Sequence, residues 1–402
     1  MIPVADAIKI VLKEAAALPA ESVALEAARA RILAEDVIAD SDLPPFDRSQ
    51  MDGYAIRAAD VAKAPAKLRI VGESAAGRGW HEELNAGQAV RIMTGAPVPV
   101  GADSVQQLEL TTENGDEVEI LQTVTTGRSI VRRGSEIKAN ECVANSGARI
   151  NAAMMAVLAS FGYANVKVSR QPRIAVLATG TELVRVDQKP GRDQIRDSNN
   201  FTISAYAQMA GATVRQLPLA GDDRDSLKRQ ITESAEHSDI VITSGGVSVG
   251  AYDFTKPALR ELGAQLFFER VALRPGKPTV FARLPNGTLF FGLPGNPVSV
   301  SVTFNLFTRA AILAMQSARD IALSEEWARL ARGAKGASER DSYLPALLHT
   351  DETGTVSATP LKWGGSSDFI GFVSATALIV VPRDTGALEA GTIVKVVQLP
   401  RG

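Results

Sequence analysis

The stretch LRPGKPTVFARLPNGTLFFGLPGNPVS, residues 273 to 299, is the part of the chain that decides the fold. It contains two proline-glycine turns, at residues 275–276 and 294–295, separated by apolar segments that the Asn-Gly pair at 286–287 closes into a hairpin. Because a hairpin folds back on itself, we expect the two turns to be neighbours in space. Proline fixes φ and glycine permits positive φ, so both turns should be rigid and should expose backbone amides.

Polar side chains accompany these turns. Arg274 and Lys277 flank the first turn, and Ser299 follows the second. Proline-glycine turns also occur between strands for purely structural reasons. Two such turns beside fixed cations, however, favour a binding site for an anion.

Composition excludes several classes of function. The chain has 402 residues, of which 45% are hydrophobic and 22% charged, as expected for a soluble globular protein of several domains. A formal net charge of -2 without a basic run argues against a nucleic-acid partner. The longest apolar stretches, such as residues 152–161, are too short to span a membrane, and the N-terminus interleaves charged residues. We therefore expect a cytoplasmic protein with no membrane partner.

Cysteine and histidine are scarce. Cys142 is the single cysteine, and His81, His237 and His349 lie far apart in the sequence. A disulfide within the chain is impossible, and the spacing of these residues does not match a Cys/His zinc site. We interpret Cys142 as a small buried side chain. Carboxylates, hydroxyls, Lys, Arg and backbone amides must then carry the chemistry, which suits oxyanion or metal-phosphate chemistry.

The first half of the chain combines helical and strand patterns. Apolar spacing predicts a helix over residues 4–17 that continues through 22–36, and another helix over 151–162. Short alternating strands between them, including a hairpin at Asn114-Gly115, predict a small β domain. We therefore divide this half into a helical linker region, 1–45 with 141–170, and a β domain, 46–140.

The second half begins with an α/β pattern in residues 171–324. Apolar strands alternate with helices, which predicts a mostly parallel sheet with ligands beyond the carboxyl ends of its strands. The predicted strands are 173–180, 212–221 and 239–246, and the predicted helices are 198–211, 225–234 and 254–262. Residues 325–402 alternate without a helical run, so we expect a β barrel or sandwich there.

Three strand ends of the α/β region deliver carboxylates. Glu182, Asp222 and Asp253 follow glycine-terminated strands, with Ser248 near the last of them. Carboxylates beside a bound phosphate usually indicate a bridging Mg²⁺. Each alone could instead cap a helix. Neither a GxGxxG fingerprint nor a P-loop occurs, so a dinucleotide site or P-loop is not supported.

Several long motifs resemble one family. The strings PPFDRSQMDGYAIR (44–57), RIMTGAPVPVGAD (91–103), SGGVSVGAYDFTK (244–256) and GLPGNPVS (292–299) resemble the molybdopterin molybdenumtransferases, the MoeA and gephyrin E-domain proteins. The similarity covers nearly the whole chain, in order. It implies a multidomain α/β fold: a central molybdopterin-binding domain, a helical linker region, a small inserted β domain and a C-terminal β barrel. It also implies that molybdate is inserted into adenylylated molybdopterin with release of AMP.

The resemblance assigns roles to individual residues. The acidic groups Glu182, Asp222 and Asp253 would hold Mg²⁺ and the pyrophosphate of the adenylate. Asp52 and Thr94 match functional positions that would reach the neighbouring subunit's site in an elongated homodimer. The residues expected to bind molybdate are Ser248, Arg274, Lys277, Pro278, Ser299, Arg340 and Ser366. The residues expected to bind the adenylylated molybdopterin are Thr179, Gly180, Gly245, Gly246, Gly295 and Asn296.

Some positions depart from the family pattern, and some alternatives stay open. Arg270 and Arg274 stand where lysines are usual, and a planar guanidinium would change the shape of the pocket. The residues do not distinguish molybdate from tungstate. Transient contacts with the adenylyltransferase partner and with apo-molybdoenzymes are expected. Two other functions are a nucleotide pyrophosphatase of the competence-damage type and a non-catalytic gephyrin-like scaffold.

Overall fold

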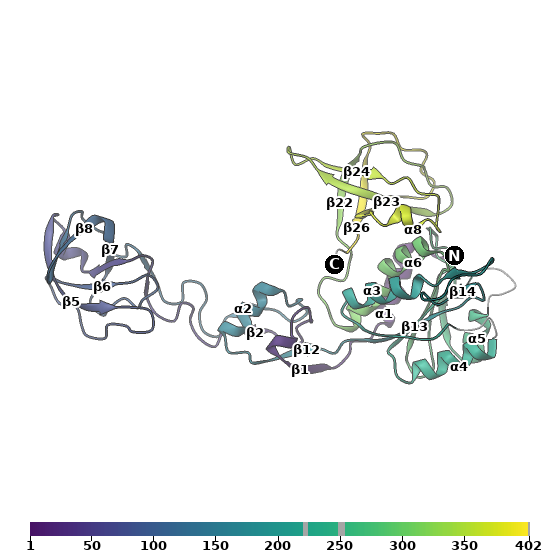
Figure 1. The fold of residues 1–402 in the computed structure, drawn as a ribbon, viewed down its shortest axis with the longest axis horizontal. Coiled ribbons are helices and arrows are strands. Elements are labelled where there is room, and N and C mark those ends of the chain that lie inside the picture. The colour runs from purple at the N-terminus through teal and green to yellow at the C-terminus, as the bar shows by residue number, and fades with distance from the viewer. Residues whose placement is uncertain (220–223, 248–253, 401–402) are drawn as a thin grey trace. The chain divides into compact units, whose positions relative to one another are not determined.

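The computed structural model describes residues 1–219, 224–247 and 254–400 (Figure 1). The chain forms two compact units. The first comprises Met1–Glu35, Ser146–Asn151 and Asn165–Gly402, and the second comprises Asp36–Asn145 and Ala152–Ala164. The finer division into four regions stays a prediction.

A six-stranded sheet lies at the centre of the first unit. Its strand order is β16-β13-β17-β21-β20-β18, in which the first four strands are parallel, β20 runs antiparallel to β21, and β18 runs antiparallel to β20 and so in the direction of the first four. The strands are β13 (Arg173–Ala178), β16 (Thr213–Gln216), β17 (Ile240–Ser244), β18 (Gln265–Phe268), β20 (Val280–Arg283) and β21 (Leu289–Leu293). The predicted mostly parallel sheet is confirmed, and so is the hairpin around Asn286-Gly287, which pairs β20 with β21.

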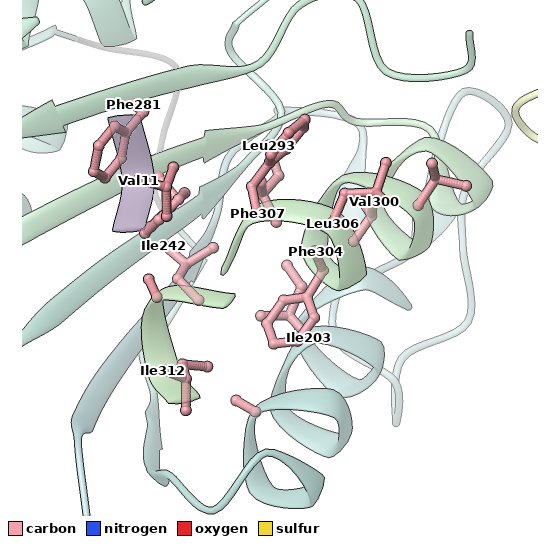
Figure 2. Close-up of a cluster of buried hydrophobic side chains, with 14 of the residues drawn as sticks. Val11, Ile203, Ile242, Phe281, Leu293, Val300, Phe304, Leu306, Phe307 and Ile312 are labelled. Carbon is pink, nitrogen blue, oxygen red and sulfur yellow. The ribbon is translucent and has the colours of Figure 1, made fainter. Parts of the chain in front are cut away.

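Helices cover both faces of this sheet (Figure 1). Side chains alternate along each strand, so Ile240 and Ile242 enter one core while Val241 enters the other. Figure 2 shows part of the first core, where Ile242 and Phe281 from the sheet gather with helical side chains such as Phe304. Helices α1 (Val4–Glu14), α3 (Asn199–Met209), α6 (Pro297–Thr303) and α7 (Arg309–Met315) build that core, and α4 (Arg224–Ala235) and α5 (Thr255–Glu261) build the other.

A long helical segment follows the second proline-glycine turn. Helix α6 continues through a π-helical turn, η4 (Phe304–Thr308), into α7. By length and composition alone Pro297–Met315 could cross a membrane, but 89% of its most apolar window is buried within the protein. The expectation that every apolar stretch is too short for a span is wrong for this segment, which has the burial of a core helix.

The predicted helix over residues 22–36 is wrong. Strand β1 (Ala20–Ala24) pairs antiparallel with β12 (Asn165–Ser169), and a single 3₁₀ turn, η1 (Leu25–Ala27), follows. Strand pairing with a distant segment has overridden the local helical spacing.

The C-terminal strands close into a five-stranded barrel. Strand β22 (Glu325–Leu330) pairs with both β26 (Ile393–Gln398) and β24 (Val356–Pro360), and β23 (Asp341–Thr350) and β25 (Ala377–Val381) complete the ring. The predicted barrel is confirmed. The short helix α8 (Phe369–Phe372) contradicts the expectation that this region contains no helical run.

Short strands connect other parts of the first unit. Strand β19 (Leu273–Arg274) pairs parallel with β23, which ties the segment before the first proline-glycine turn to the barrel. A small ribbon, β14 (Leu183–Val184) with β15 (Ile195–Arg196), follows the carboxyl end of β13.

The second unit contains a six-stranded sheet of order β7-β4-β6-β5-β9-β8. The strands are β4 (Gly53–Ile56), β5 (Ala66–Ser74), β6 (Gln88–Ile92), β7 (Ser104–Gln107), β8 (Thr111–Asn114) and β9 (Glu117–Ile120). The predicted hairpin at Asn114-Gly115 is confirmed. Shorter elements are η2 (Ala58–Val61), η3 (Leu108–Leu110), the pair β3 (Arg48–Ser49) and β10 (Ile130–Val131), the pair β2 (Val37–Ile38) and β11 (Cys142–Ala144), and helix α2 (Ala152–Ser160).

The interpretation of Cys142 as buried is wrong. Its side chain is exposed, because β11 belongs to a two-stranded ribbon with β2. The Nδ2 of Asn145 donates to its Sγ at 3.0 Å.

Candidate functional site

A cleft of about 1660 Å³ lies in the first unit, between the sheet and the barrel. One side consists of the carboxyl ends of β13, β17 and β21 together with both proline-glycine turns. The other side consists of barrel segments at residues 332–345 and 360–366. The expectation that the two turns lie close together is confirmed, since both line this one cleft.

The structure gathers most of the predicted binding residues here. Asp222, Ser248 and Asp253 lie outside the described residues. Asp52 and Thr94 belong to the second unit. The other predicted residues all line the cleft: Thr179, Gly180, Glu182, Gly245, Gly246, Arg274, Lys277, Pro278, Gly295, Asn296, Ser299, Arg340 and Ser366. Their individual roles remain predictions.

Close backbone packing shapes the strand ends. Gly245 has φ of +88°, and a Cβ at this position would lie 2.6 Å from the carbonyl oxygen of Thr179. A Cβ on Gly295 would lie 3.6 Å from the Cα of Gly245, so the second turn passes directly beside the end of β17. Glycine therefore lets these backbone segments converge and leaves the cleft open above them.

The first turn is fixed by its own contacts. Gly276 has φ of +118°, and an added Cβ would approach the Cγ2 of Thr303 to 2.4 Å. The hydroxyl of Thr279 donates to the Gly276 carbonyl at 2.7 Å, and the amide of Val271 donates to the Lys277 carbonyl at 3.0 Å. The exposed side chains of Arg274 and Lys277 thus extend from a constrained loop.

A barrel loop meets the second turn. The Nδ2 of Asn296 donates to the Oγ of Ser366 at 2.7 Å, and the amide of Val298 donates to the Ser366 carbonyl at 3.0 Å. Asp368 organises this loop by accepting hydrogen bonds from the amides of Gly371 and Gly364, which hold the pKa of its carboxyl below the ordinary value. Ser366 is therefore presented to the cleft in a defined position.

The cleft carries a large excess of positive charge. Glu182 is the one carboxylate among its described lining residues. The lining cations are Arg274, Lys277, Arg332, Lys335, Arg340 and Lys362. A pocket of this kind in a chain of net charge -2 concentrates anions.

Sequence reasoning missed part of this lining. Arg332, Lys335, Lys362 and the indole of Trp363 were not predicted, yet all line the cleft. The sequence pattern that could have identified these residues is a pair of glycine-containing segments with cations, RGAKG at 332–336 and KWGG at 362–365. Such loops allow close backbone approach to a ligand.

The described donors do not by themselves make a metal site. Within residues 1–219, 224–247 and 254–400, no group of three His, Cys, Asp or Glu side chains is placed to hold an ion. Glu182 supplies a single carboxylate at the cleft. Any Mg²⁺ site would depend on Asp222 and Asp253, so magnesium stays a prediction.

Asp52 and Thr94 form a local pair in the second unit. The Oδ1 of Asp52 accepts hydrogen bonds from both the amide and the hydroxyl of Thr94, each at 2.7 Å. The amide first, and then the hydroxyl, hold the pKa of Asp52 below its ordinary value. Both hydrogen bonds therefore favour the ionised form of the Asp52 carboxyl.

Comparison with known proteins covers the chain from end to end. The family models that match are the MoeA N-terminal region (domain I and II) at residues 2–162, a probable molybdopterin binding domain at 175–314, and the MoeA C-terminal region (domain IV) at 327–399. The first and third of these lie outside the α/β domain, as do two of the four motifs that suggested the resemblance, those at 44–57 and 91–103.

Named relatives and a solved structure agree. A molybdopterin molybdenumtransferase of Bacillus subtilis is 37% identical over 98% of this chain and 93% of its own length, and one of Haemophilus influenzae is 36% identical over 92% of each. The crystal structure of a molybdopterin biosynthesis MoeA protein from Pyrococcus horikosii matches all of both chains, with a TM-score of 0.84 at 30% identity. The chain therefore belongs to the molybdopterin molybdenumtransferase family and is a transferase of molybdenum cofactor biosynthesis.

Proposed function

We propose that this protein inserts molybdate into adenylylated molybdopterin and releases AMP. The observation that carries the proposal is the charge of the cleft, where six cations face one described carboxylate. Molybdate is a dianion, and the adenylylated pterin carries a pyrophosphate. A cleft that binds both must supply fixed positive charge and hydrogen-bond donors.

The oxyanion would lie beside the first proline-glycine turn. Arg274 and Lys277 supply charge from that turn, and Arg340 approaches from the barrel, where its Nη1 donates to the Leu273 carbonyl at 3.3 Å. The Oγ of Ser366 already accepts a hydrogen bond from Asn296, so its O–H is the group that can donate to an anion. These groups suit a tetrahedral oxyanion, which offers acceptors in several directions.

The pyrophosphate would lie at the strand ends. The glycines at 180, 245 and 246 bring backbone to the cleft without side chains of their own, and the carboxylate of Glu182 lies next to Gly180. Cleaving the anhydride bond leaves negative charge on the phosphate of AMP. Fixed donors and cations would stabilise that charge as it develops.

Further parts of the proposal concern the metal and the assembly. We propose that Glu182, Asp222 and Asp253 hold Mg²⁺, which would offset the charge of the pyrophosphate. We also propose a cytoplasmic homodimer in which Asp52 and Thr94 serve the neighbouring subunit's site. Transient contacts with the adenylyltransferase and with apo-molybdoenzymes would deliver the substrate and remove the product.

A genetic test decides whether the whole reaction occurs. The gene should restore molybdenum to molybdenum-dependent enzymes in a strain that lacks its insertase. The molybdenum content of one purified enzyme is the readout, and an empty vector is the control. A nucleotide pyrophosphatase or a non-catalytic scaffold would leave that enzyme without metal, and this outcome would overturn the proposal.

A further inference from the structure

Three cations on the barrel side of the cleft have no role in the proposed reaction so far. They are Arg332, Lys335 and Lys362, which come from the loops after β22 and β24. We call these residues, together with Trp363, the barrel wall. All four line the same cleft as the two proline-glycine turns.

The loop that carries Lys335 is held in place. The amide of Ala334 donates to the Leu388 carbonyl at 2.8 Å, and the Leu388 amide donates back at 2.9 Å. A Cβ on Gly336 would lie 2.4 Å from the carbonyl oxygen of Thr385, so the loop packs tightly against its neighbour. Lys335 therefore projects from a backbone that a ligand does not need to order.

The loops that carry the other two cations, Arg332 and Lys362, are joined by a hydrogen bond. The guanidinium of Arg332 donates from Nε to the carbonyl of Pro360 at 3.0 Å, and Pro360 stands two residues before Lys362. Among the residues that the structure describes, neither Lys335 nor Lys362 forms an ion pair, and both side chains are exposed. Two ammonium groups are thus available to an anion.

Trp363 adds an aromatic surface to this charge. It is half-buried, packs partly against the core and also lines the cleft. An indole beside an ammonium group suits a ligand that has both a planar heteroaromatic ring and a phosphate, because the ring stacks while the phosphate pairs. A free oxyanion has no ring and gains nothing from the indole.

We propose that the barrel wall binds the nucleotide portion of the substrate, with Trp363 against the adenine ring and with Lys335 and Lys362 facing the phosphate of AMP from the barrel side of the cleft, while the strand ends hold the pyrophosphate from the other side. The inference rests on the proposed function, which supplies a nucleotide. The volume of the cleft, about 1660 Å³, exceeds the roughly 300–1,000 Å³ of ordinary small-molecule sites. Nucleotide and oxyanion can therefore occupy separate parts of it.

The test is direct binding of AMP and, separately, of molybdate to the full-length protein. Lys335→Ala and Lys362→Ala should each lower the affinity for AMP by about tenfold and keep the affinity for molybdate within about twofold of wild type. Lys395→Ala is the matched control, since Lys395 lies in β26, pairs with Glu325 and does not line the cleft. Both affinities should be unchanged in this control.

Trp363 has its own readout. AMP should quench indole fluorescence in the wild type but not in Trp363→Phe. Trp327→Phe is the control, because Trp327 is exposed on the barrel and does not line the cleft, and AMP should still quench the fluorescence of this variant. Three results would overturn the inference. They are unchanged AMP affinity in both lysine variants, an equal loss of affinity for molybdate and for AMP, and no AMP binding by the wild type. AMP release during turnover is measured separately, so a failed proposed function is distinguished from a failed nucleotide site.

Discussion

The side chains of Asn296 and Ser366 join the two sides of the cleft through a 2.7 Å hydrogen bond from Nδ2 to Oγ. Asn296 stands at the start of α6 and Ser366 in the barrel loop before α8, so this contact fixes the position of the serine hydroxyl. Asn296→Ala should lower the affinity for molybdate by about fivefold, which corresponds to the loss of one hydrogen bond of about 1 kcal/mol. Titration with molybdate is the measurement. Ser367→Ala, which changes a neighbouring exposed side chain outside the lining, should bind molybdate normally.

Substitution of the cations at the proposed oxyanion site should affect ligand affinities differently from substitution of groups at the strand ends. Lys277→Ala removes a charge from the proposed molybdate position, a loss of about 1.5 to 3 kcal/mol, or about ten- to more than hundredfold in affinity. Arg340→Ala should behave in the same way. Binding of adenylylated molybdopterin should change much less in both variants.

Parallel titrations with molybdate and with the pterin substrate check this difference. Unchanged molybdate dependence combined with severely weakened pterin binding would mean that the turns serve the nucleotide. The assignment of the two parts of the cleft would then be reversed.

A shared active site predicts complementation between inactive proteins. If Asp52 of one subunit serves the site that contains Asp253 of the other, a mixed dimer of Asp52→Ala and Asp253→Ala has one intact site out of two. Random exchange makes about half of the dimers mixed, so about a quarter of wild-type activity should return. Exchange is verified with tagged subunits. If mixed dimers form and remain inactive, the shared-site model is wrong.

Stability at acid pH should depend on Asp239, at the start of β17. Burial raises the pKa of its carboxyl, but hydrogen bonds from Arg170, at 2.8 and 2.9 Å, and from the Arg173 amide outweigh burial and hold the pKa below 3.8. The carboxylate therefore stabilises the fold above about pH 4, and this contribution is lost as the pH falls through the lower folded pKa.

Asp239→Asn should lower the unfolding free energy at pH 7 by about 2 kcal/mol, because the Asp239 side chain is only 12% exposed. The difference in unfolding free energy between Asp239→Asn and the wild type should become smaller below pH 3.8. Urea unfolding of both proteins over a range of pH measures this difference. Asp187→Asn is the control, because its pair with Arg185 is exposed and contributes little. A gap that is constant down to pH 2 would contradict the role of the Asp239 charge.

The sequence predicted the fold best where local pattern and tertiary packing agree. Strand β17 is buried on both faces and begins with three consecutive apolar residues, Ile240 to Ile242, so its pattern alone identified it. The proline-glycine turns were predicted to converge because a hairpin of fixed length joins them. Residues 22–24 were misassigned to a helix because the partner of their strand lies at 165–169, and no local signal encodes that pairing.

The site was predictable to a similar extent. Residues in recognisable motifs, such as Lys277 and Asn296, were found. Lys335 and Trp363 were not, because the closure of the barrel, and not their sequence neighbourhood, places them in the cleft. The exposure of Cys142 escaped prediction for a related reason, since it depends on the number of strands that pair beside it.

The most direct test of the central claim counts AMP released against molybdenum bound in a single turnover of purified protein with adenylylated molybdopterin. We expect one AMP for each molybdenum incorporated, dependent on both molybdate and Mg²⁺. Glu182→Gln should fold normally and release AMP at least about 10²-fold more slowly. AMP release without molybdenum incorporation, or a wild-type rate in Glu182→Gln at saturating Mg²⁺, would contradict the account.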